Sequence, residues 1–160
     1  MSLSIIAAVG KNNELGRKNK LLWHFKEDMH FFKDLTTGHP VIMGRRTFES
    51  LPDGALPNRR NIVITSRENY YAENAEVVCS VHEALKAVLN DKEAYIIGGA
   101  KVYAQLLPQC DNIYLTEIDA EYPTADVFFP DFNKSNYKRK KLGEHTVNGI
   151  HFEHIVYSVR

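Results

Sequence analysis

The segment AYIIGGAKVYAQLL, residues 94–107, decides the fold. Ala94–Ile97 is a short apolar run without polar alternation, which is typical of a strand covered on both faces. Gly98-Gly99 follows it, and a helical pattern then continues until Pro108 ends it. The segment therefore predicts a buried strand that passes through two glycines into a helix.

The same alternation of strand and helix extends in both directions along the chain. Strands are expected over Leu3–Val9, Pro40–Met43, Asn61–Thr65, Ala75–Cys79, Ala94–Ile97 and Asn112–Ile118, and helices over Lys26–Thr36, Arg45–Leu51, Val81–Leu89 and Lys101–Leu107. Ser80 suits the N-cap of the third helix, and Glu83 completes a capping box with it. Strands that alternate with helices imply right-handed crossovers and a mostly parallel sheet.

The C-terminal region follows a different pattern. Tyr137–Val147 and Ile150–Val159 flank Asn148-Gly149, the dipeptide best suited to a type I′ hairpin turn. The predicted fold class is therefore α/β: an open, mostly parallel twisted sheet with helices on both faces and an antiparallel C-terminal hairpin. No linker, repeat or low-complexity segment interrupts the sequence, so residues 1–160 are expected to form a single domain.

Composition excludes several classes of protein. A hydrophobic content of 44% with 25% charged residues is ordinary for a globular chain, and a formal net charge of zero supplies no field for nucleic acid. The cationic run from Lys138 to Lys141 suits an exposed edge strand guarded by charge. Cys79 and Cys110 lack the spacing of a zinc site or a disulfide framework. No signal peptide or membrane helix is recognisable, so a soluble cytoplasmic protein is expected.

In an open α/β sheet, ligands bind beyond the carboxyl ends of the strands. Four segments follow predicted strands: the polar loop Gly10–His24, Gly44-Arg45-Arg46-Thr47, Thr65-Ser66-Arg67 and Gly98-Gly99. Glycines at such a junction let the backbone approach a ligand, and the following helix N-terminus offers N–H groups to a phosphate. A plain tight turn explains the glycines equally well, and the chain has no GxGxxG motif.

Cations and hydroxyls at neighbouring strand ends suggest a phosphate site. Arg45 beside Thr47, and Thr65-Ser66-Arg67, would suit a phosphate monoester such as the 2′-phosphate of NADPH. Solvated surface arginines are the alternative. Arg59-Arg60 could in the same way bind an acidic substrate tail or form a charged turn.

Asp28 is a carboxylate beside an apolar stripe. On the predicted helix it lies in line with Phe32 and Leu35, at positions i, i+4 and i+7. It could act in a pocket, or it could simply favour the positive end of the helix dipole.

Taken together, these segments resemble the dihydrofolate reductase family over nearly the whole chain. The resemblance is carried by SIIAAVGKNNELG (4–16), Trp23 five residues before Asp28, PVIMGRRTFESL (40–51), LPNRRNIVITS (56–66), YIIGGAKVYAQLLP (95–108), IYLTEIDAEY (113–122) and FFPDF (128–132). It implies reduction of 7,8-dihydrofolate to 5,6,7,8-tetrahydrofolate with NADPH, in folate one-carbon metabolism. Hydride would pass to pterin C6, with protonation at N5.

The resemblance also implies roles for individual residues. The catalytic group would be Asp28, Trp23, Thr116 and Tyr103, with Asp28 bonding the pterin 2-amino group and N3, Thr116 supporting that acid and Trp23 ordering water. The substrate contacts would be Ile6, Ala8, Asp28, Met29, Phe32, Leu51, Leu56, Arg59 and Thr116, with Arg59 holding the α-carboxylate of the glutamate tail. The NADPH contacts would be Ala8, Leu15, Gly16, Leu21, Gly44, Arg45, Arg46, Thr47, Thr65, Ser66, Arg67, Ile97, Gly98, Gly99, Ala100, Lys101, Val102, Tyr103 and Gln105. No metal is implied, and the Gly98–Gly99 peptide is expected to be cis.

The chain departs from the family pattern before Trp23, where Leu22 replaces the usual proline and leaves the dynamics of the loop open. Leu21 stands where methionine is common. Two other classes remain as alternatives. A related pteridine or pyrimidine reductase, such as that of riboflavin biosynthesis, should share the glycine turn but lack the Trp23/Asp28 pair and Arg59. A non-catalytic NADPH-binding module needs no acid. Family habit implies a monomer with dihydrofolate as its partner and no nucleic acid or membrane.

Overall fold

A computed structural model describes residues 1–18 and 20–160; Asn19, within the loop expected over residues 10–24, lies outside the described residues. The strands of the main sheet are β1 (Ser2–Val9), β4 (Val41–Gly44), β5 (Asn61–Ile64), β6 (Glu76–Val78), β7 (Glu93–Gly98), β8 (Asn112–Ile118), β10 (Tyr137–Val147) and β11 (Ile150–Val159). The helices are α1 (Lys26–Thr36), α2 (Arg45–Ser50), α3 (Val81–Ala87) and α4 (Ala100–Leu106), with short 3-10 turns η1 (Leu107–Gln109) and η2 (Lys134–Asn136). Bounds differ from the expected ones by one or two residues at most.

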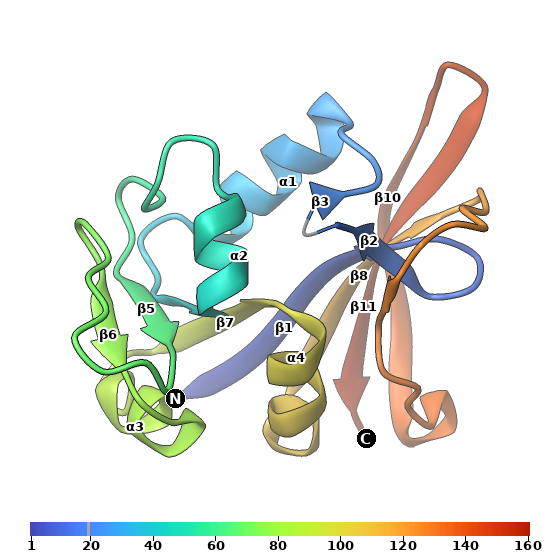
Figure 1. Cartoon of the computed structure of the whole chain (residues 1–160). Helices are drawn as coiled ribbons and strands as arrows, with labels where there is room; N and C mark the ends of the chain where they lie inside the picture. Colours follow the sequence, from blue (N-terminus) through green and yellow to red (C-terminus); the bar gives the residue numbers. More distant parts are fainter. Residues whose placement is uncertain (19) are drawn as a thin grey trace.

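The main sheet has the strand order β10-β11-β8-β1-β7-β4-β5-β6 (Figure 1). From β8 to β6 each neighbouring pair is parallel, whereas β11 pairs antiparallel with both β8 and β10. Asn148 and Gly149 have φ values of 51° and 79°, as a type I′ turn requires. The predicted fold class is confirmed.

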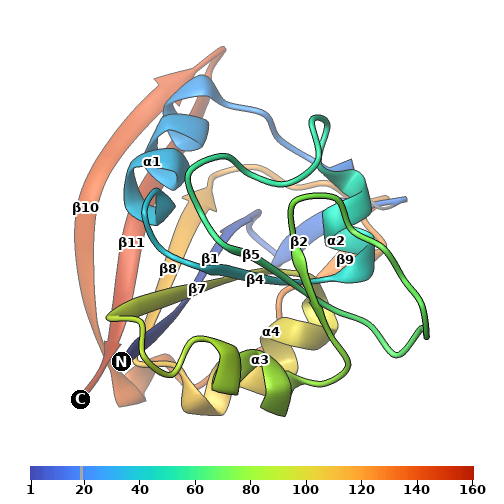
Figure 2. The ribbon, with the colours of Figure 1, turned by 90° about the vertical axis from the view of Figure 1, so that its left-hand side faces the viewer.

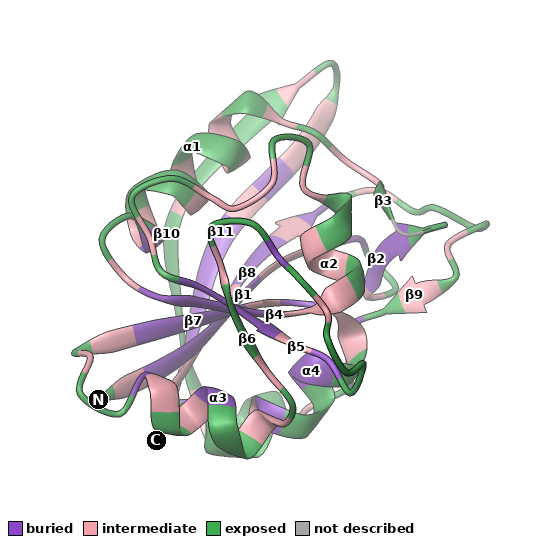
Figure 3. Cartoon of the chain, turned by 60° about the vertical axis from the view of Figure 1, so that its left-hand side comes forward, coloured by how far each residue is buried: buried purple, intermediate pink, exposed green. Residues whose placement is uncertain are grey.

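Helices cover both faces of the sheet, with α1 and α2 on one side and α3 and α4 on the other (Figure 2). Side chains of one strand alternate between these layers: Ile42 packs toward α3 and α4, whereas Val41 and Met43 pack toward α1 and α2. The central strands are accordingly the most buried part of the molecule (Figure 3). None of the helices within residues 1–18 and 20–160 has the length and apolar character needed to cross a membrane.

Helix α3 begins where its capping residues predict. Ser80 Oγ accepts a hydrogen bond from the Glu83 N–H at 3.1 Å. Glu83 Oε2 accepts in return from the Cys79 N–H at 2.9 Å, one residue before the N–H that a standard capping box uses.

The expectation that Gly10–His24 forms only a polar loop is wrong. Strands β2 (Glu14–Arg17) and β3 (Lys20–Leu21) lie within it and form a second, three-stranded sheet with β9 (Val127–Phe128). Such short strands carry too few residues for a period of two to be recognised. The pairing of β2 with β9, a segment more than a hundred residues away, is a tertiary contact that local patterning does not predict.

Glu14 holds this second sheet against the main one. Its side chain is 2% exposed, and its two carboxylate oxygens accept the N–H groups of Asn12 and Tyr122, each at 2.7 Å. A Cβ at Gly10 would lie 2.5 Å from Glu14 Oε1 and 2.6 Å from the Trp23 ring, so only glycine fits there. Burial raises the pKa of Glu14, but the backbone N–H groups outweigh it, and the net direction is downward.

Replacing Glu14 by glutamine should lower the free energy of unfolding at pH 7 by about 1.5–3 kcal/mol, because the amide turns a donor toward one of the two N–H groups. A carboxyl whose folded pKa is depressed stabilises above its ordinary value of 4.5 and loses that contribution as pH falls through the folded pKa. The difference from the parent chain should therefore narrow below pH 4.5. Urea unfolding at pH 7 and at a pH below 4.5 measures this difference. Glu121→Gln, which changes an exposed acid of the same region, is the control.

Candidate active site

The carboxyl ends of β8, β1, β7 and β4 bring the predicted site residues together. Thr116 of β8 pairs in register with Ala8 of β1, and Gly98 ends β7. The order of these strands in the sheet makes their ends neighbours. Residues that are distant in the sequence therefore line one edge, as expected for an open α/β sheet.

Asp28 meets Thr116 across this edge. Asp28 is the third residue of α1, and its Oδ1 accepts a hydrogen bond of 2.5 Å from the Thr116 hydroxyl. The stripe predicted beside it is present, because Phe32 and Leu35 pack into the core under α1. The side chain of Asp28 is 23% exposed. Burial raises the pKa of Asp28, and the bond from Thr116 lowers it by less, so the net direction is upward.

The two glycines make a close approach between β7 and α4. The Gly98–Gly99 peptide is cis, as expected. Gly98 has a φ of +135°, which residues that carry a side chain rarely adopt. A Cβ at Gly98 would lie 3.2 Å from Thr47 Oγ1 and 3.5 Å from the Tyr103 hydroxyl. The backbone here is thus bare, and hydroxyl groups flank it.

One row of contacts, which runs along β1, joins Asp28 to the Gly98–Gly99 turn. Tyr103 is buried, and its hydroxyl donates to the Ile6 carbonyl at 2.9 Å while lying beside Gly98. Two residues further along β1, Ala8 lies opposite Thr116, the partner of Asp28. Burial raises the pKa of Tyr103, so this phenol stays protonated and serves as a donor.

Several side chains of the predicted phosphate region are held by hydrogen bonds and an ion pair. Arg45 Nη1 lies 2.7 Å from Glu49 Oε1, one turn further along α2, and the other oxygen of Glu49 accepts from the Tyr70 hydroxyl at 3.0 Å. Thr65 is buried, and its hydroxyl accepts from the Arg67 N–H at 3.1 Å. Arg45 is therefore held at the end of β4 by a neighbouring acid.

The structure separates the two adjacent arginines. Arg60 is engaged by Glu76 through two hydrogen bonds of 2.8 and 2.9 Å and by Asp91 at 2.8 Å, which makes it part of the scaffold. Arg59 donates instead to the Thr36 hydroxyl at 3.0 Å and to a carbonyl of its own turn. No carboxylate among the described residues pairs with Arg59, and burial lowers its pKa.

The other predicted contact residues differ in exposure. Leu21, Met29, Arg46, Ser66, Arg67, Lys101 and Gln105 are exposed, whereas Ala8, Trp23, Phe32, Gly44, Thr47, Leu51, Leu56, Ile97, Gly99 and Ala100 are half-buried. Ile6, Leu15, Gly16, Thr65 and Val102 are buried. Leu15 and Val102 belong to the core cluster beneath α4, so packing explains their apolar character without a ligand.

Two polar residues at or near this edge were missed by the sequence analysis. The sequence pattern assigned no role to Glu14. His154 was one of seven scattered histidines, but its ring is 3% exposed and Nδ1 lies 3.1 Å from the Thr116 hydroxyl. The only available signal was the alternation of β11, which places His154 opposite Thr116 once the strand order is known.

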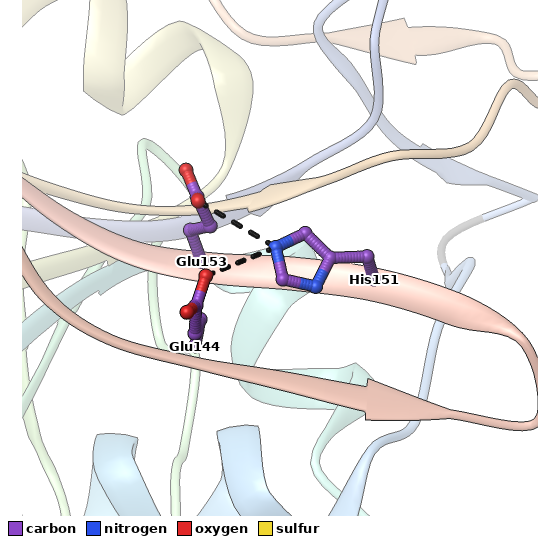
Figure 4. Close-up of side chains that lie close together, drawn as sticks. All are labelled: Glu144, His151 and Glu153. Atoms are coloured by element: carbon purple, nitrogen blue, oxygen red, sulfur yellow. Dashed lines mark ion pairs between the residues drawn. The ribbon is translucent and has the colours of Figure 1, made fainter.

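A second cluster on the C-terminal hairpin resembles a metal site in its residue types. His151 Nε2 lies 3.3 Å from Glu144 Oε2 and 3.5 Å from Glu153 Oε2 (Figure 4). However, Lys141 Nζ lies 2.6 Å from the same oxygen of Glu144 and 3.3 Å from that of Glu153. The ammonium group of Lys141 already pairs with both carboxylates, so we interpret the cluster as an ion-pair network that joins β10 to β11.

Fold and site together define an α/β protein with the half-buried acid Asp28 and a bare glycine turn at the carboxyl edge of its sheet. A sequence profile described as dihydrofolate reductase matches residues 2–158. The chain is 40% identical to a dihydrofolate reductase of Neisseria gonorrhoeae over 98% of both chains, and 42% identical to a type 3 dihydrofolate reductase of Salmonella typhimurium over 91% of this chain and 88% of that one. The chain belongs to the dihydrofolate reductase family.

A solved structure shares the whole architecture. Dihydrofolate reductase from Enterococcus faecalis, complexed with NADP(H) and RAB-propyl, superposes with a TM-score of 0.90 at 33% identity, covering 99% of this chain and 96% of that one.

Asp28→Asn should raise the free energy of unfolding at pH 7 by roughly 0.5–2 kcal/mol, the usual range of a stabilising substitution, because a neutral amide avoids the cost of a half-buried charge. A folded pKa above the ordinary 3.8 means that ionised Asp28 costs stability at high pH, and that this cost disappears as pH falls toward 3.8. The gain should therefore be full at pH 7 and small near pH 4 in urea unfolding curves. Equal stability of the two chains at pH 7 would contradict the assigned burial.

Proposed function

We propose that this chain reduces 7,8-dihydrofolate to 5,6,7,8-tetrahydrofolate with NADPH. The observation that carries the proposal is the half-buried Asp28 carboxyl, held by Thr116 in the same row of contacts as the Gly98–Gly99 turn. Family membership supports it, as does the solved relative that contains NADP(H). A binding module without chemistry has no use for an acid in this position.

The residues present fit a dinucleotide. The cis glycine pair leaves the end of β7 without side chains and beside the Thr47 hydroxyl, where a Cβ would otherwise fill the approach. Hydroxyls and cations follow at the ends of β4 and β5, among them Arg45, Thr65 and Arg67. NADPH, when bound, supplies a hydride. The proposed contacts are those implied by the resemblance.

Asp28 is proposed to bind the pteridine and to hold the second reactant, a proton. Thr116 bonds Oδ1, so Oδ2 is left to accept from the 2-amino group and N3 of the substrate. Because burial favours the neutral carboxyl, Asp28 keeps its proton to a higher pH than an exposed aspartate does, and this proton is available for N5. A hydride at C6 and a proton at N5 convert the N5=C6 double bond to a single bond, and the cofactor leaves oxidised.

Apolar side chains around Asp28 exclude water from this step. Phe32, Leu51 and Leu56 pack half-buried under α1, while Met29 is 60% exposed at the rim. Arg59, whose charge no acid among the described residues neutralises, suits the carboxylate of the substrate's glutamate tail. Trp23 lies edge-on to Tyr122, with 6.4 Å between ring centroids, and its ring lies close to Gly10.

The remaining properties follow from family membership. We propose a single domain over residues 1–160 that acts as a monomer in the cytoplasm, with dihydrofolate as its partner and without nucleic acid. The cationic run on β10 is consistent with this, because Arg139 and Lys141 pair with acids of the hairpin and of β8.

Asp28→Asn should lower the rate of hydride transfer at pH 7 by roughly 10²–10⁴, the usual contribution of a positioned acid. The fall in NADPH absorbance after addition of dihydrofolate measures the rate, and NADH in its place tests the choice of cofactor. Asp34→Asn, an exposed acid on the same helix, is the matched control and should retain the parent rate. Parent-like turnover of Asp28→Asn would remove Asp28 from the mechanism.

Arg59→Ala should weaken dihydrofolate binding by about 1.5–3 kcal/mol, because charge-assisted hydrogen bonds to the tail are lost. A dihydropteridine without the glutamate tail should bind the parent chain and the variant equally well. Fluorescence titration of both ligands separates the two cases. Equal weakening of both would place the effect in the pteridine cleft rather than at the tail.

A further inference from the structure

His154 is a buried base that the proposed mechanism does not use. It lies on β11 directly opposite Thr116 of β8, and its ring stacks on Phe31 of α1 with 4.1 Å between centroids. The ring is 3% exposed. Nδ1 lies 3.1 Å from the Thr116 hydroxyl oxygen and 3.6 Å from Asp28 Oδ1, whereas Nε2 is buried and has no hydrogen-bond partner among residues 1–18 and 20–160.

The hydrogen bonds determine which nitrogen of His154 carries the proton. A carboxylate only accepts, so the Thr116 proton is committed to Asp28 and the hydroxyl oxygen offers His154 only its lone pairs. Nδ1 must then be the donor in this bond. A neutral imidazole has a single N–H, so Nε2 carries a lone pair, and an unpaired buried lone pair is less unfavourable than an unpaired N–H.

The surroundings keep this ring neutral. Within the described part of the chain, three groups able to titrate or to bond face it: Asp28 from α1, the Thr116 hydroxyl from β8, and His145 from β10 at 5.7 Å between ring centroids. The Asp28 carboxylate favours an imidazolium, but burial opposes it and His145 adds to the opposition. Burial prevails, because Nε2 lacks an acceptor, and it lowers the pKa of His154 to about 4.

We propose that His154 is a positioning residue of the active site: its Nδ1–H donates to Thr116 Oγ1 and thereby directs the Thr116 hydroxyl proton onto Asp28. Donation to the hydroxyl oxygen polarises the O–H bond and strengthens the bond that it makes in turn. That bond stabilises the ionised carboxyl. His154 therefore opposes the effect of burial on Asp28 and sets the pH range in which Asp28 holds its proton.

Two variants separate the donor from the ring. His154→Phe keeps an aromatic ring against Phe31 but removes the donor. His154→Asn loses the ring but places a side-chain N–H at the position of Nδ1. The pKa of the Asp28 carboxyl, followed by ¹³C NMR of the free protein, should rise by roughly 0.3–1 pH unit in His154→Phe and stay near the parent value in His154→Asn.

Thr116→Val tests the route of the effect. In that background His154→Phe should shift the Asp28 pKa no further, because the bridging hydroxyl is gone. Ring ¹⁵N shifts of His154 in the parent chain should show Nδ1 protonated and Nε2 unprotonated at pH 7. A protonated Nε2, an unmoved Asp28 pKa in His154→Phe, or an equal rise in both single variants would overturn the proposal.

A kinetic measurement completes the test and rests on the proposed function. The pH above which hydride transfer declines should move upward in His154→Phe by the same amount as the NMR pKa. The NMR arms need no turnover. If the pKa shift appears in a chain that does not reduce dihydrofolate, the proposed function fails and the role of His154 stands. If the chain reduces dihydrofolate but the Asp28 pKa does not shift, the proposed function stands and the role of His154 fails.

Discussion

The whole site depends on which hydrogen-bond donors replace water around a carboxylate that is removed from solvent. Glu14 is a buried acid and Asp28 a half-buried one, and they are compensated differently. Two backbone N–H groups satisfy Glu14, and its pKa is lowered. One hydroxyl group satisfies Asp28, and its pKa is raised. The number and type of donors therefore separate an acid whose ionised form is favoured, and which ties the second sheet to the segment after β8, from an acid that can hold a proton.

The partners of Asp28 also affect stability. Asp28 costs stability when ionised, so its contribution is least favourable at high pH. His154 acts at the other end of the scale: its folded pKa of about 4 lies below its ordinary 6.5, so between these values only the unfolded chain takes up the proton and stability falls as pH falls. The two groups therefore respond to pH in opposite ways: a higher pH increases the cost of ionised Asp28, and a lower pH increases the cost of keeping His154 neutral. Glu14, whose pKa is lowered, stabilises the folded chain above its ordinary pKa of 4.5.

Most of the fold could be predicted from the sequence, because long periodic segments such as Asn112–Ile118 and the Asn148-Gly149 turn carry their structure locally. The second sheet could not, because β3 has two residues and its neighbours pair across long distances in the chain. The same limit applies to the site. The sequence pattern allowed two interpretations of Asp28: an acid in a pocket, or an acid that only favours the positive end of the helix dipole. Only the tertiary contact with Thr116, 88 residues away, distinguishes the two.

The C-terminal hairpin is connected to Asp28 through two successive strand pairings. Asn148-Gly149 and the irregularity between Lys141 and Gly143 set how β10 pairs with β11, and β11 in turn pairs with β8. Side chains alternate along a strand, so a slip of one residue would turn His154 away from Thr116 and bring Glu153 or Ile155 to its place. Glu153 would set a second carboxylate beside Asp28, and Ile155 would leave the Thr116 oxygen without a donor. The ion pairs that join β10 to β11 on the outside of the hairpin favour the observed register. The ion pair between Arg139 of β10 and Glu117 of β8 acts closer to the acid, because Glu117 follows Thr116 on the same strand.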